Sequence, residues 1–238
     1  MVFPEQPEFV AGGNAVIFGA GGGIGCALVD VLRNRRDLSG VIGFSRSSYP
    51  AIDLLNEASL KEAAAFAAAQ GDIRIVVDAT GFLHDETHQP EKSWRDLDPS
   101  QMARSFALNA IGPALIMKHI LPLLPRMGRS VFASLSAKVG SIGDNQLGGW
   151  YSYRASKAAL NQLIHTASIE LKRQRPAAIC VSLHPGTVET RLAAPFRKTG
   201  LQIQSPKDAA ECLIATMEKL GFNDSGGFFD QRGKRIPW

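Results

Sequence analysis

Short apolar runs alternate with longer helical patterns along almost the whole chain, and this alternation restricts the possible folds more than any other feature of the sequence. The apolar runs predict strands at residues 15–18, 41–44, 73–77, 130–135, 178–183 and 227–230. Helical spacing predicts helices at residues 24–34, 57–70, 99–117, 153–172 and 206–219, with Asp98 and Ser205 as caps of the third and the last. Strands that alternate with helices in this way form a parallel sheet that is covered on both faces. We therefore predict an α/β fold in which residues 1–238 form a single doubly wound domain.

Composition and charge exclude several classes of protein. Apolar residues make up 45% of the chain and charged residues 20%, so a globular rather than a disordered protein is expected. The net charge of +4 is spread along the chain and does not indicate a nucleic-acid partner. The apolar runs are shorter than the roughly 20 residues that span a bilayer, and the first residues lack a secretory signal, so we expect a cytoplasmic protein without membrane contact. Three widely spaced cysteines and five histidines without ligand spacing predict neither disulfides nor a metal site.

A glycine-rich turn, GAGGGIG at residues 19–25, lies between the first predicted strand and the first predicted helix. Gly19, Gly21, Gly23 and Gly25 allow the backbone to turn tightly and to approach a pyrophosphate, which the free amides and the dipole at a helix start attract. Ile24 belongs to the same predicted cofactor-binding turn. The pattern is typical of Rossmann-type dinucleotide sites, although a glycine-rich turn can also simply join a strand to a helix.

The end of the second predicted strand favours NADP(H) over NAD(H) as the cofactor. NAD sites usually have an acidic residue there, which bonds the ribose 2′-hydroxyl, whereas a 2′-phosphate requires a cation. The sequence at residues 43–47 is GFSRS, which has no carboxylate, and the planar guanidinium of Arg46 is suited to hold a phosphate. The alternative is that Arg46 is a solvated turn residue.

Tyr153 and Lys157 are four residues apart in a predicted helix, so their side chains share one helix face. A free tyrosine has a pKa of about 10 and is a poor acid or base at neutral pH. Because a neighbouring ammonium stabilises the phenolate, we expect Lys157 to lower the pKa of Tyr153 toward the working range. Taken alone, the same spacing also suits a solvated helix face.

Two further motifs follow predicted strands, DATG at residues 78–81 and PGTVET at residues 185–190, and Asn109 lies in the predicted helix at residues 99–117, in the run LNAIGP. With the glycine turn and the Tyr153–Lys157 pair, they stand in the order of the short-chain dehydrogenase/reductase superfamily, which the chain resembles over essentially its whole length. The run at residues 140–161 and the ending IPW are most similar to the C-factor and sniffer-type carbonyl reductase branch. The resemblance implies cofactor contacts at Asp53, Leu54, Ala79, Thr80, Gly81, Asn109, Tyr153, Lys157, Pro185, Gly186, Val188 and Thr190. An aspartate that opens a turn would explain Asp53 equally well.

The resemblance implies hydride transfer between NADP(H) and a small-molecule carbonyl or alcohol substrate. Tyr153 would exchange a proton with the substrate oxygen, Lys157 would lower the pKa of Tyr153 and bond the nicotinamide ribose, and Asn109 would hold a water that links Lys157 to solvent. It also implies a homodimer or homotetramer, and a substrate lid at residues 191–204. The alternative is a regulatory or signalling protein of the same fold that binds a nucleotide with weak or no turnover.

The chain departs from the family pattern in three places. The family's catalytic serine lies three residues before a glycine, and Ala137 holds that position here. Ser136 is our first candidate for the role, followed by Ser141 and Ser134, and all three could instead be hydroxyls bonded to backbone. Asp78 replaces an asparagine and, when ionised, accepts hydrogen bonds but cannot donate them. The acidic-apolar pair follows the second strand too closely for a full helix, so one crossover is expected to be reduced to a loop.

Overall fold

The computed structural model describes residues 12–192 and 203–238 of the chain. Its strands are β1 (Gly13–Phe18), β2 (Leu38–Phe44), β3 (Ile73–Asp78), β4 (Ser130–Leu135), β5 (Ala178–His184), β6 (Thr187–Val188), β7 (Ile203–Gln204) and β8 (Phe228–Asp230). Its α-helices are α1 (Gly23–Arg33), α2 (Glu57–Ala69), α3 (Pro99–Phe106), α4 (Gly112–Ile120), α5 (Tyr151–Gln174) and α6 (Pro206–Lys219). Each element predicted from the sequence is present. β4 and α6 have the predicted bounds, the other elements have shifted ends, and one predicted helix is interrupted.

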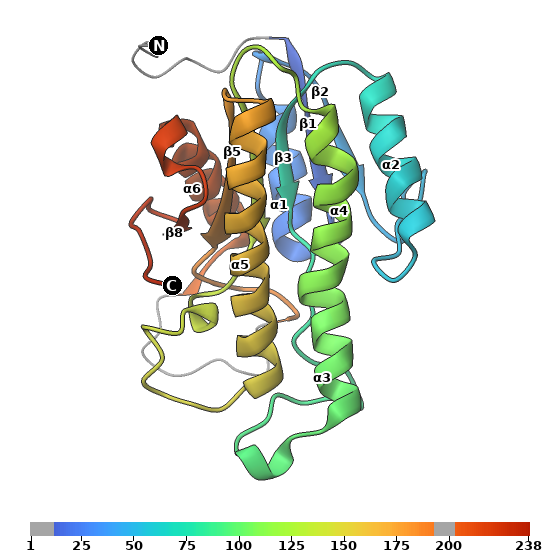
Figure 1. Cartoon of the computed structure of the whole chain (residues 1–238). Helices are drawn as coiled ribbons and strands as arrows, with labels where there is room; N and C mark the ends of the chain where they lie inside the picture. The colour runs from blue at the N-terminus through green and yellow to red at the C-terminus, as the bar shows by residue number, and fades with distance from the viewer. Residues whose placement is uncertain (1–11, 193–202) are drawn as a thin grey trace.

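The main sheet has the strand order β2-β1-β3-β4-β5-β8, and its neighbouring strands pair in parallel. The chain winds from β1 to β2 in one direction and from β3 to β8 in the other, so the winding reverses between β1 and β3. In sheets of this kind, ligands bind outside the carboxyl ends of the strands at such a switch point. These ends point to the lower half of Figure 1, where α5 begins.

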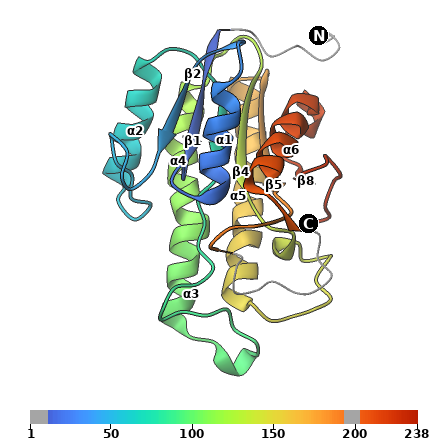
Figure 2. The ribbon, with the colours of Figure 1, turned by 180° about the vertical axis from the view of Figure 1, so that it is seen from behind.

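Helices cover both faces of the sheet, which confirms the predicted doubly wound α/β domain. Val16 and Phe18 of β1 belong to the core shared with α2, α4 and α5, on the near side in Figure 1. Ala15 and Ile17 alternate with them and belong to the core shared with α1 and α6, which are in front in Figure 2. Since every residue of β1 is buried, both faces of this central strand are fully packed.

The predicted helix at residues 99–117 is divided into α3, a π-helical turn at Ala107–Ile111 and α4. Such turns are rare and are frequently found at functional sites, and this one contains Asn109. Within the described part of the chain, the helical stretch Pro99–Leu123 has the length and the composition of a bilayer span. In this fold the stretch packs against α2 and α5 and covers one face of the sheet, as the core helix of a globular domain does.

The prediction that one crossover is reduced to a loop is wrong, because the crossover from β2 to β3 contains the complete helix α2. Residues 45–56 form a loop without a helix, and the chain then enters α2, whose first turn is capped by the side chain of Asn56. This loop lies next to the glycine turn, because a Cβ on Gly21 would be 3.3 Å from the Cβ of Ser45. The loop after β2 therefore borders the switch point.

Candidate active site

The glycine turn joins β1 to α1 beside the end of β3. Gly19 has a φ of +83°, which residues with a side chain rarely adopt, and a Cβ there would lie 2.8 Å from the backbone carbonyl of Ala79. A Cβ on Gly25 would lie 2.2 Å from the carbonyl oxygen of Gly19. Since both contacts involve backbone atoms, a side chain at either position would force the turn to move.

The start of α1 has the properties of an anion-binding site. Its N-cap, Gly22, offers no side chain to the first amides, and the first turn contains no acidic residue. Residues 21–23 are exposed, while Ile24 is packed in part against the sheet. A Cβ on Gly23 would lie 2.9 Å from the methyl carbon of Thr190, so the loop after β5 borders this turn. These residues fit a dinucleotide pyrophosphate, because the uncapped first amides and the dipole of α1 attract an anion and the first turn carries no acidic residue.

The end of β2 presents a cation and two hydroxyls beside the glycine turn. Arg46 is exposed, and no ion pair joins it to another residue of the described chain. The hydroxyls of Ser45 and Ser47 lie 3.2 Å apart, and the backbone amide of Ser47 donates to the Ser45 hydroxyl. The Arg46 guanidinium and these hydroxyls can donate to a phosphate, and the group has no carboxylate of the kind that bonds the ribose 2′-hydroxyl in NAD sites.

Asp53 and Leu54 take part in local structure. The Asp53 carboxylate accepts a hydrogen bond from the backbone amide of Leu55 at 2.9 Å. The aspartate side chain thereby closes a turn of its own backbone. Leu54 packs against α4, where a Cβ on Gly112 would lie 2.8 Å from the Cβ of Leu54. The structure thus shows the turn function of Asp53, and its contact with adenine stays a prediction.

Lys157 is almost fully buried in the second turn of α5. Its ammonium donates a hydrogen bond to the carbonyl oxygen of Leu135, the last residue of β4, at 2.8 Å. A Cβ on Gly140 would lie 2.8 Å from the Cβ of Lys157, so only a glycine allows the segment after β4 to come this close to α5. Burial lowers the pKa of Lys157 to about 8, and the charge of Asp78 opposes that shift.

The structure corrects the expected effect of Lys157 on Tyr153. Burial of the phenol raises the pKa of Tyr153 to about 12, and the ammonium of Lys157 donates its hydrogen bond to the carbonyl oxygen of Leu135. A phenol with this pKa keeps its proton at neutral pH, so it is prepared to donate a proton rather than to accept one. That state suits the direction in which a carbonyl is reduced.

Asn109 joins the π-helical turn to the segment that follows β3. Its side-chain amide donates to the carbonyl oxygen of Phe82 at 2.7 Å, and its side-chain oxygen accepts from the amide of Phe82 at 2.7 Å. It also donates to the hydroxyl of Ser156 on α5. A Cβ on Gly81 would lie 3.7 Å from the Lys157 ammonium and 3.8 Å from the Asn109 oxygen, so these two groups border the same space. The observed function of Asn109 is to fix this corner, and the predicted water between Lys157 and solvent stays a prediction.

The three candidate serines differ in what their hydroxyls bond. Ser134 donates to the Asp78 carboxylate at 2.6 Å, and Ser141 donates to the carbonyl oxygen of Pro237 at 2.6 Å and accepts from the amide of Asp144. Ser136 is buried, and its hydroxyl has no hydrogen-bond partner in the described chain. An unpaired buried hydroxyl is costly unless something else bonds it. Of the three candidates, Ser136 is therefore the serine whose hydroxyl has no partner in the described chain.

The loop after β5 contains β6, which pairs in parallel with β7. Both strands have two residues and are too short to give a sequence pattern. Gly186 has a φ of +80°, and the side chain of Gln204 donates to the carbonyl oxygen of Pro185. Val188 in β6 is buried and fixes the loop to the body of the domain. The predicted lid at residues 191–204 lies largely outside the described residues, since 193–202 are not among them.

Glu91 is a site residue that the sequence analysis missed. It is buried, and its carboxylate accepts hydrogen bonds from the backbone amide and the hydroxyl of Ser152, in the first turn of α5. Trp150, the residue just before α5, has a φ of +53°. Its ring packs edge-on against the ring of Tyr153, with centroids 6.2 Å apart. Glu91 thus caps the helix that carries Tyr153. No motif marks it, because its partner is 61 residues away in the sequence.

We expect Glu91→Ala to lower the free energy of unfolding by about 0.5–2 kcal/mol, the usual cost of losing a helix cap. The same variant should lower kcat, because the first turn of α5 sets the position of Tyr153. Urea denaturation and initial rates measure the two effects. Glu86→Ala is the matched control, since Glu86 is exposed in the same loop. Equal stability of the two variants would contradict the capping function.

In the described part of the chain, no three His, Cys, Asp or Glu side chains gather as a metal-binding group, so the predicted absence of a metal stays a prediction.

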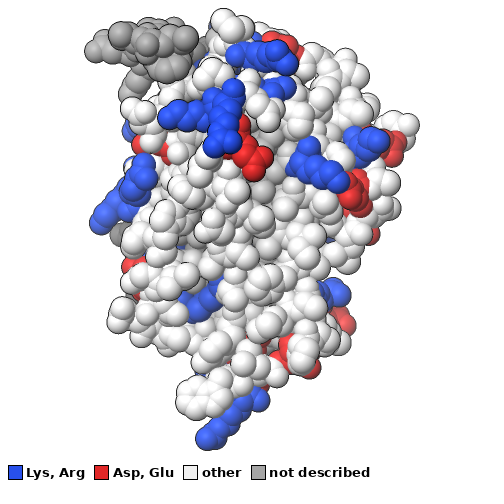
Figure 3. Space-filling model, in the orientation of Figure 1, with Lys and Arg blue, Asp and Glu red and all other residues white. Residues whose placement is uncertain are grey.

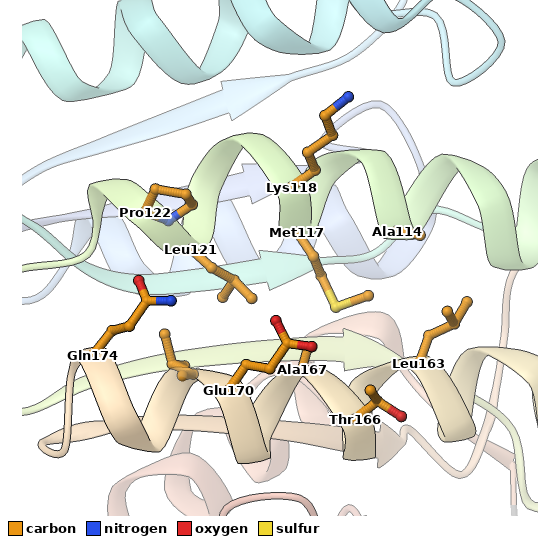
Figure 4. Close-up of a pocket in the computed structure, with 11 residues that line it drawn as sticks. Ala114, Met117, Lys118, Leu121, Pro122, Leu163, Thr166, Ala167, Glu170 and Gln174 are labelled. Atoms are coloured by element: carbon orange, nitrogen blue, oxygen red, sulfur yellow. The ribbon is translucent and has the colours of Figure 1, made fainter.

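A shallow groove between α4 and α5 is lined by apolar side chains such as Met117 and Leu163 (Figure 4). Leu163 is ten residues after Tyr153 in α5, which is about 15 Å along the helix, so this groove is not the active site.

Comparison with known families assigns the chain to a class. A family model described as enoyl-(acyl carrier protein) reductase matches residues 23–212. This span begins at Gly23, within the glycine turn, and includes the Tyr153–Lys157 pair and the loop after β5. The chain belongs to the short-chain dehydrogenase/reductase superfamily, whose members are oxidoreductases that act on small molecules.

Individual relatives and solved structures agree with this assignment. The C-signal of Myxococcus xanthus is 34% identical over 143 residues, 60% of this chain and 82% of the relative. A dehydrogenase of Rhodococcus, named 1-hydroxy-2-glutathionyl-2-methyl-3-butene dehydrogenase, is 31% identical over 79% of each chain. The structure of the carbonyl reductase Sniffer of D. melanogaster has a TM-score of 0.81 at 24% identity and covers 94% of this chain and 99% of its own. NADPH-bound carbonyl reductase from chicken fatty liver has a TM-score of 0.82 at 22% identity, with 97% and 100% coverage, and both structures show a shared fold.

Proposed function

We propose that the protein is an NADP(H)-dependent reductase of small-molecule carbonyl compounds, able to oxidise the corresponding alcohols in the reverse direction. The observation that carries the proposal is the grouping of three side chains at the carboxyl edge of the sheet. These are a protonated phenol at Tyr153, a buried ammonium at Lys157 and an unpaired buried hydroxyl at Ser136. When bound, the nicotinamide supplies or accepts the hydride.

Each of these side chains has a separate task in the proposed reaction. Tyr153 donates its proton to the substrate oxygen in the direction of reduction and takes a proton from the alcohol in the reverse direction. Ser136 donates a hydrogen bond to the same oxygen, on which negative charge develops. Lys157 bonds the nicotinamide ribose through its ammonium, which the carbonyl oxygen of Leu135 holds in place. Asn109 keeps the neighbouring corner at Phe82 in place.

The proposed cofactor site follows the carboxyl edge of the sheet. The amides at the start of α1 hold the pyrophosphate, and Ser45, Arg46 and Ser47 hold the 2′-phosphate. The loop from Pro185 to Thr190 holds the nicotinamide end. Its last residue, Thr190, lies next to Gly23 of the glycine turn. NADPH in the chicken reductase, which has the same fold, supports this choice of cofactor.

A panel of aldehydes, ketones and quinones, tested with NADPH and with NADH, examines the proposed activity. We expect oxidation of NADPH with at least one class of carbonyl compound, and a lower kcat/KM with NADH. The alternative of a regulatory protein without turnover is not favoured, since the relatives and neighbours include named dehydrogenases and reductases. Binding of NADPH without turnover across the whole panel would overturn the proposal.

We expect Arg46→Ala to raise the Kd for NADPH by about ten- to a hundredfold, the effect of losing charge-assisted hydrogen bonds to a phosphate. The Kd for NADH should change little, because NADH has no 2′-phosphate. Fluorescence titration of both cofactors measures the difference. Arg36→Ala is the control, since Arg36 is an exposed arginine in the loop at the opposite end of β2. Equal losses for NADPH and NADH would remove Arg46 from the phosphate site.

We also propose that the protein forms a homodimer or homotetramer. Charged side chains are sparse across the middle of the face that α4 and α5 present (Figure 3), and the groove of Figure 4 lies on this face. Ile111, at the end of the π-helical turn before α4, and Ile169 of α5 are about half exposed, at 55% and 48%. An apolar face of this kind suits a subunit interface. Light scattering that shows a monomer would contradict the proposal.

A further inference from the structure

Asp78 is a buried carboxylate to which the proposed reaction gives no task. It ends β3 and is fully buried. One carboxylate oxygen accepts hydrogen bonds from the backbone amide of Thr80 at 3.0 Å and from the Thr80 hydroxyl at 2.5 Å. The other oxygen accepts from the hydroxyl of Ser134 at 2.6 Å. All three bonds are accepted by Asp78, and an ionised carboxylate is an acceptor only.

The ammonium of Lys157 approaches the same corner from α5. It bonds the carbonyl oxygen of Leu135 in β4, and the adjacent residue, Ser134, is paired in register with Asp78. It also borders the segment after β3, since a Cβ on Gly81 would be 3.7 Å away. The charge of Asp78 acts on Lys157 and raises its pKa against the effect of burial. A buried carboxylate and a buried ammonium therefore lie in the same corner where β3 and β4 end, each bonded to its own partners on these strands.

A buried ammonium is costly unless an opposite charge compensates it. Titratable groups also face this end of the domain from α5, β5, β8 and the turn Lys138–Gly140: Tyr153, His184, Asp230 and Lys138. The π-helical turn has no titratable residue, and Arg104 of α3 pairs with Asp85. Of these described groups, Asp78 is the one whose charge shifts the pKa of Lys157.

We propose that Asp78 is a positioning residue that serves as the counter-ion of Lys157 and keeps its ammonium protonated above the ends of β3 and β4. The family pattern has an asparagine at this position, which would preserve the shape of the turn without supplying the charge. The proposal deepens the proposed function, on which it rests only for the task of Lys157 in the reaction. The charge pair itself can be measured without turnover.

The pair makes stability depend on pH in a definite direction. The pKa of Lys157 falls from an ordinary value of 10.5 to about 8 in the folded protein. Between these values the unfolded chain binds more protons at this site than the folded protein does, so the site's contribution to stability rises as the pH rises. Removal of the Asp78 charge lowers the pKa of Lys157 further and makes this rise begin at a lower pH.

A double-mutant cycle measures the pair directly. We would compare wild type, Asp78→Asn, Lys157→Met and the double variant by urea denaturation at pH 7 and at pH 9.5. At pH 7 we expect a coupling of about tenfold in the unfolding equilibrium constant, which corresponds to one pKa unit. At pH 9.5 the coupling should be largely lost, because Lys157 has given up its proton. A coupling that is absent at pH 7, or equal at both pH values, would overturn the proposal.

Ser134→Ala is the matched control for a purely structural effect of Asp78. It removes one hydrogen bond from the same carboxylate but leaves both charges in place. Its loss of stability relative to wild type should therefore be the same at pH 7 and at pH 9.5. A loss that changes between the two pH values as much as that of Asp78→Asn would assign the effect to the hydrogen bonds and contradict the proposal.

The pH dependence of kcat/KM for reduction provides the second measurement. In wild type we expect activity to fall as the pH rises above about 8, where Lys157 loses its proton. In Asp78→Asn this alkaline limb should move to lower pH by about one unit, whereas Ser134→Ala should leave it in place. A coupling in the unfolding cycle with an unmoved limb would support the charge pair but contradict the catalytic task of Lys157, so the two proposals can fail separately.

Discussion

Tyr153→Phe is expected to lower kcat for carbonyl reduction by about 10²- to 10⁴-fold, the range over which a positioned acid accelerates a reaction. The variant loses one oxygen and keeps the ring that packs against Trp150, so the start of α5 should be preserved. The affinity for NADPH should change little, because the phenol is assigned to the substrate oxygen. Single-turnover rates and fluorescence titration of NADPH separate the loss of chemistry from a loss of binding.

Tyr151→Phe is the matched control for this experiment. Tyr151 is two residues earlier in the same helix and is half-buried, but the proposed reaction gives it no task. Its removal should leave kcat nearly unchanged. If the two variants had the same activity, or if Tyr153→Phe reduced carbonyl compounds at the rate of wild type, Tyr153 would not be the proton donor.

The fold was predictable because each element carries its own local signal. The buried strands β1, β3, β4 and β5 are runs of apolar and small residues, and the helices α2 and α6 begin at capping residues. The weakest prediction was the interrupted helix at residues 99–117. A π-helical turn keeps the same apolar spacing on either side, so nothing in the pattern distinguishes it from a continuous α-helix.

The arrangement of the candidate site was only partly predictable. Gly19 and Gly25 are required by backbone contacts that any tight strand-to-helix turn would make, so the sequence pattern was sufficient to find them. Glu91 and the bond of Ser134 to Asp78 depend on residues that are 61 and 56 positions apart, and no spacing rule connects them. The same holds for the pKa of Tyr153, which is raised by burial. Burial of one hydroxyl depends on the packing of several loops rather than on the residue four positions away.

A consequence of this comparison concerns the division of work between Tyr153 and Lys157. The spacing of the two residues predicted that they act on each other, but in the structure Lys157 interacts with β3 and β4. The ammonium is therefore held by the sheet, and the phenol by the helix cap and the ring of Trp150. Because the two groups have independent supports, variants that disturb one support should leave the position of the other group intact.

Ser136→Ala is expected to lower kcat by about 10²- to 10³-fold, the usual effect of removing one hydrogen-bond donor from an oxygen on which charge develops. The free energy of unfolding of Ser136→Ala should be equal to or higher than that of wild type. The Ser136 hydroxyl has no partner among the described residues, so its removal breaks no hydrogen bond within the protein and relieves the cost of a buried unpaired group. Loss of activity without loss of stability is therefore the expected signature of this residue.

The other two serines should behave differently, because their hydroxyls are engaged. Ser141→Ala breaks the bonds to Pro237 and Asp144 and should lower the free energy of unfolding by about 1–3 kcal/mol, with a much smaller effect on kcat than Ser136→Ala. Ser134→Ala loses its bond to Asp78 and should likewise reduce stability more than activity at pH 7. Denaturation curves and kcat at saturating NADPH for the three variants test the assignment. If Ser141→Ala were the inactive and stable variant, the substrate oxygen would lie beside Ser141, after the Lys138–Gly140 turn, and Ser136 would be a buried hydroxyl without a catalytic task.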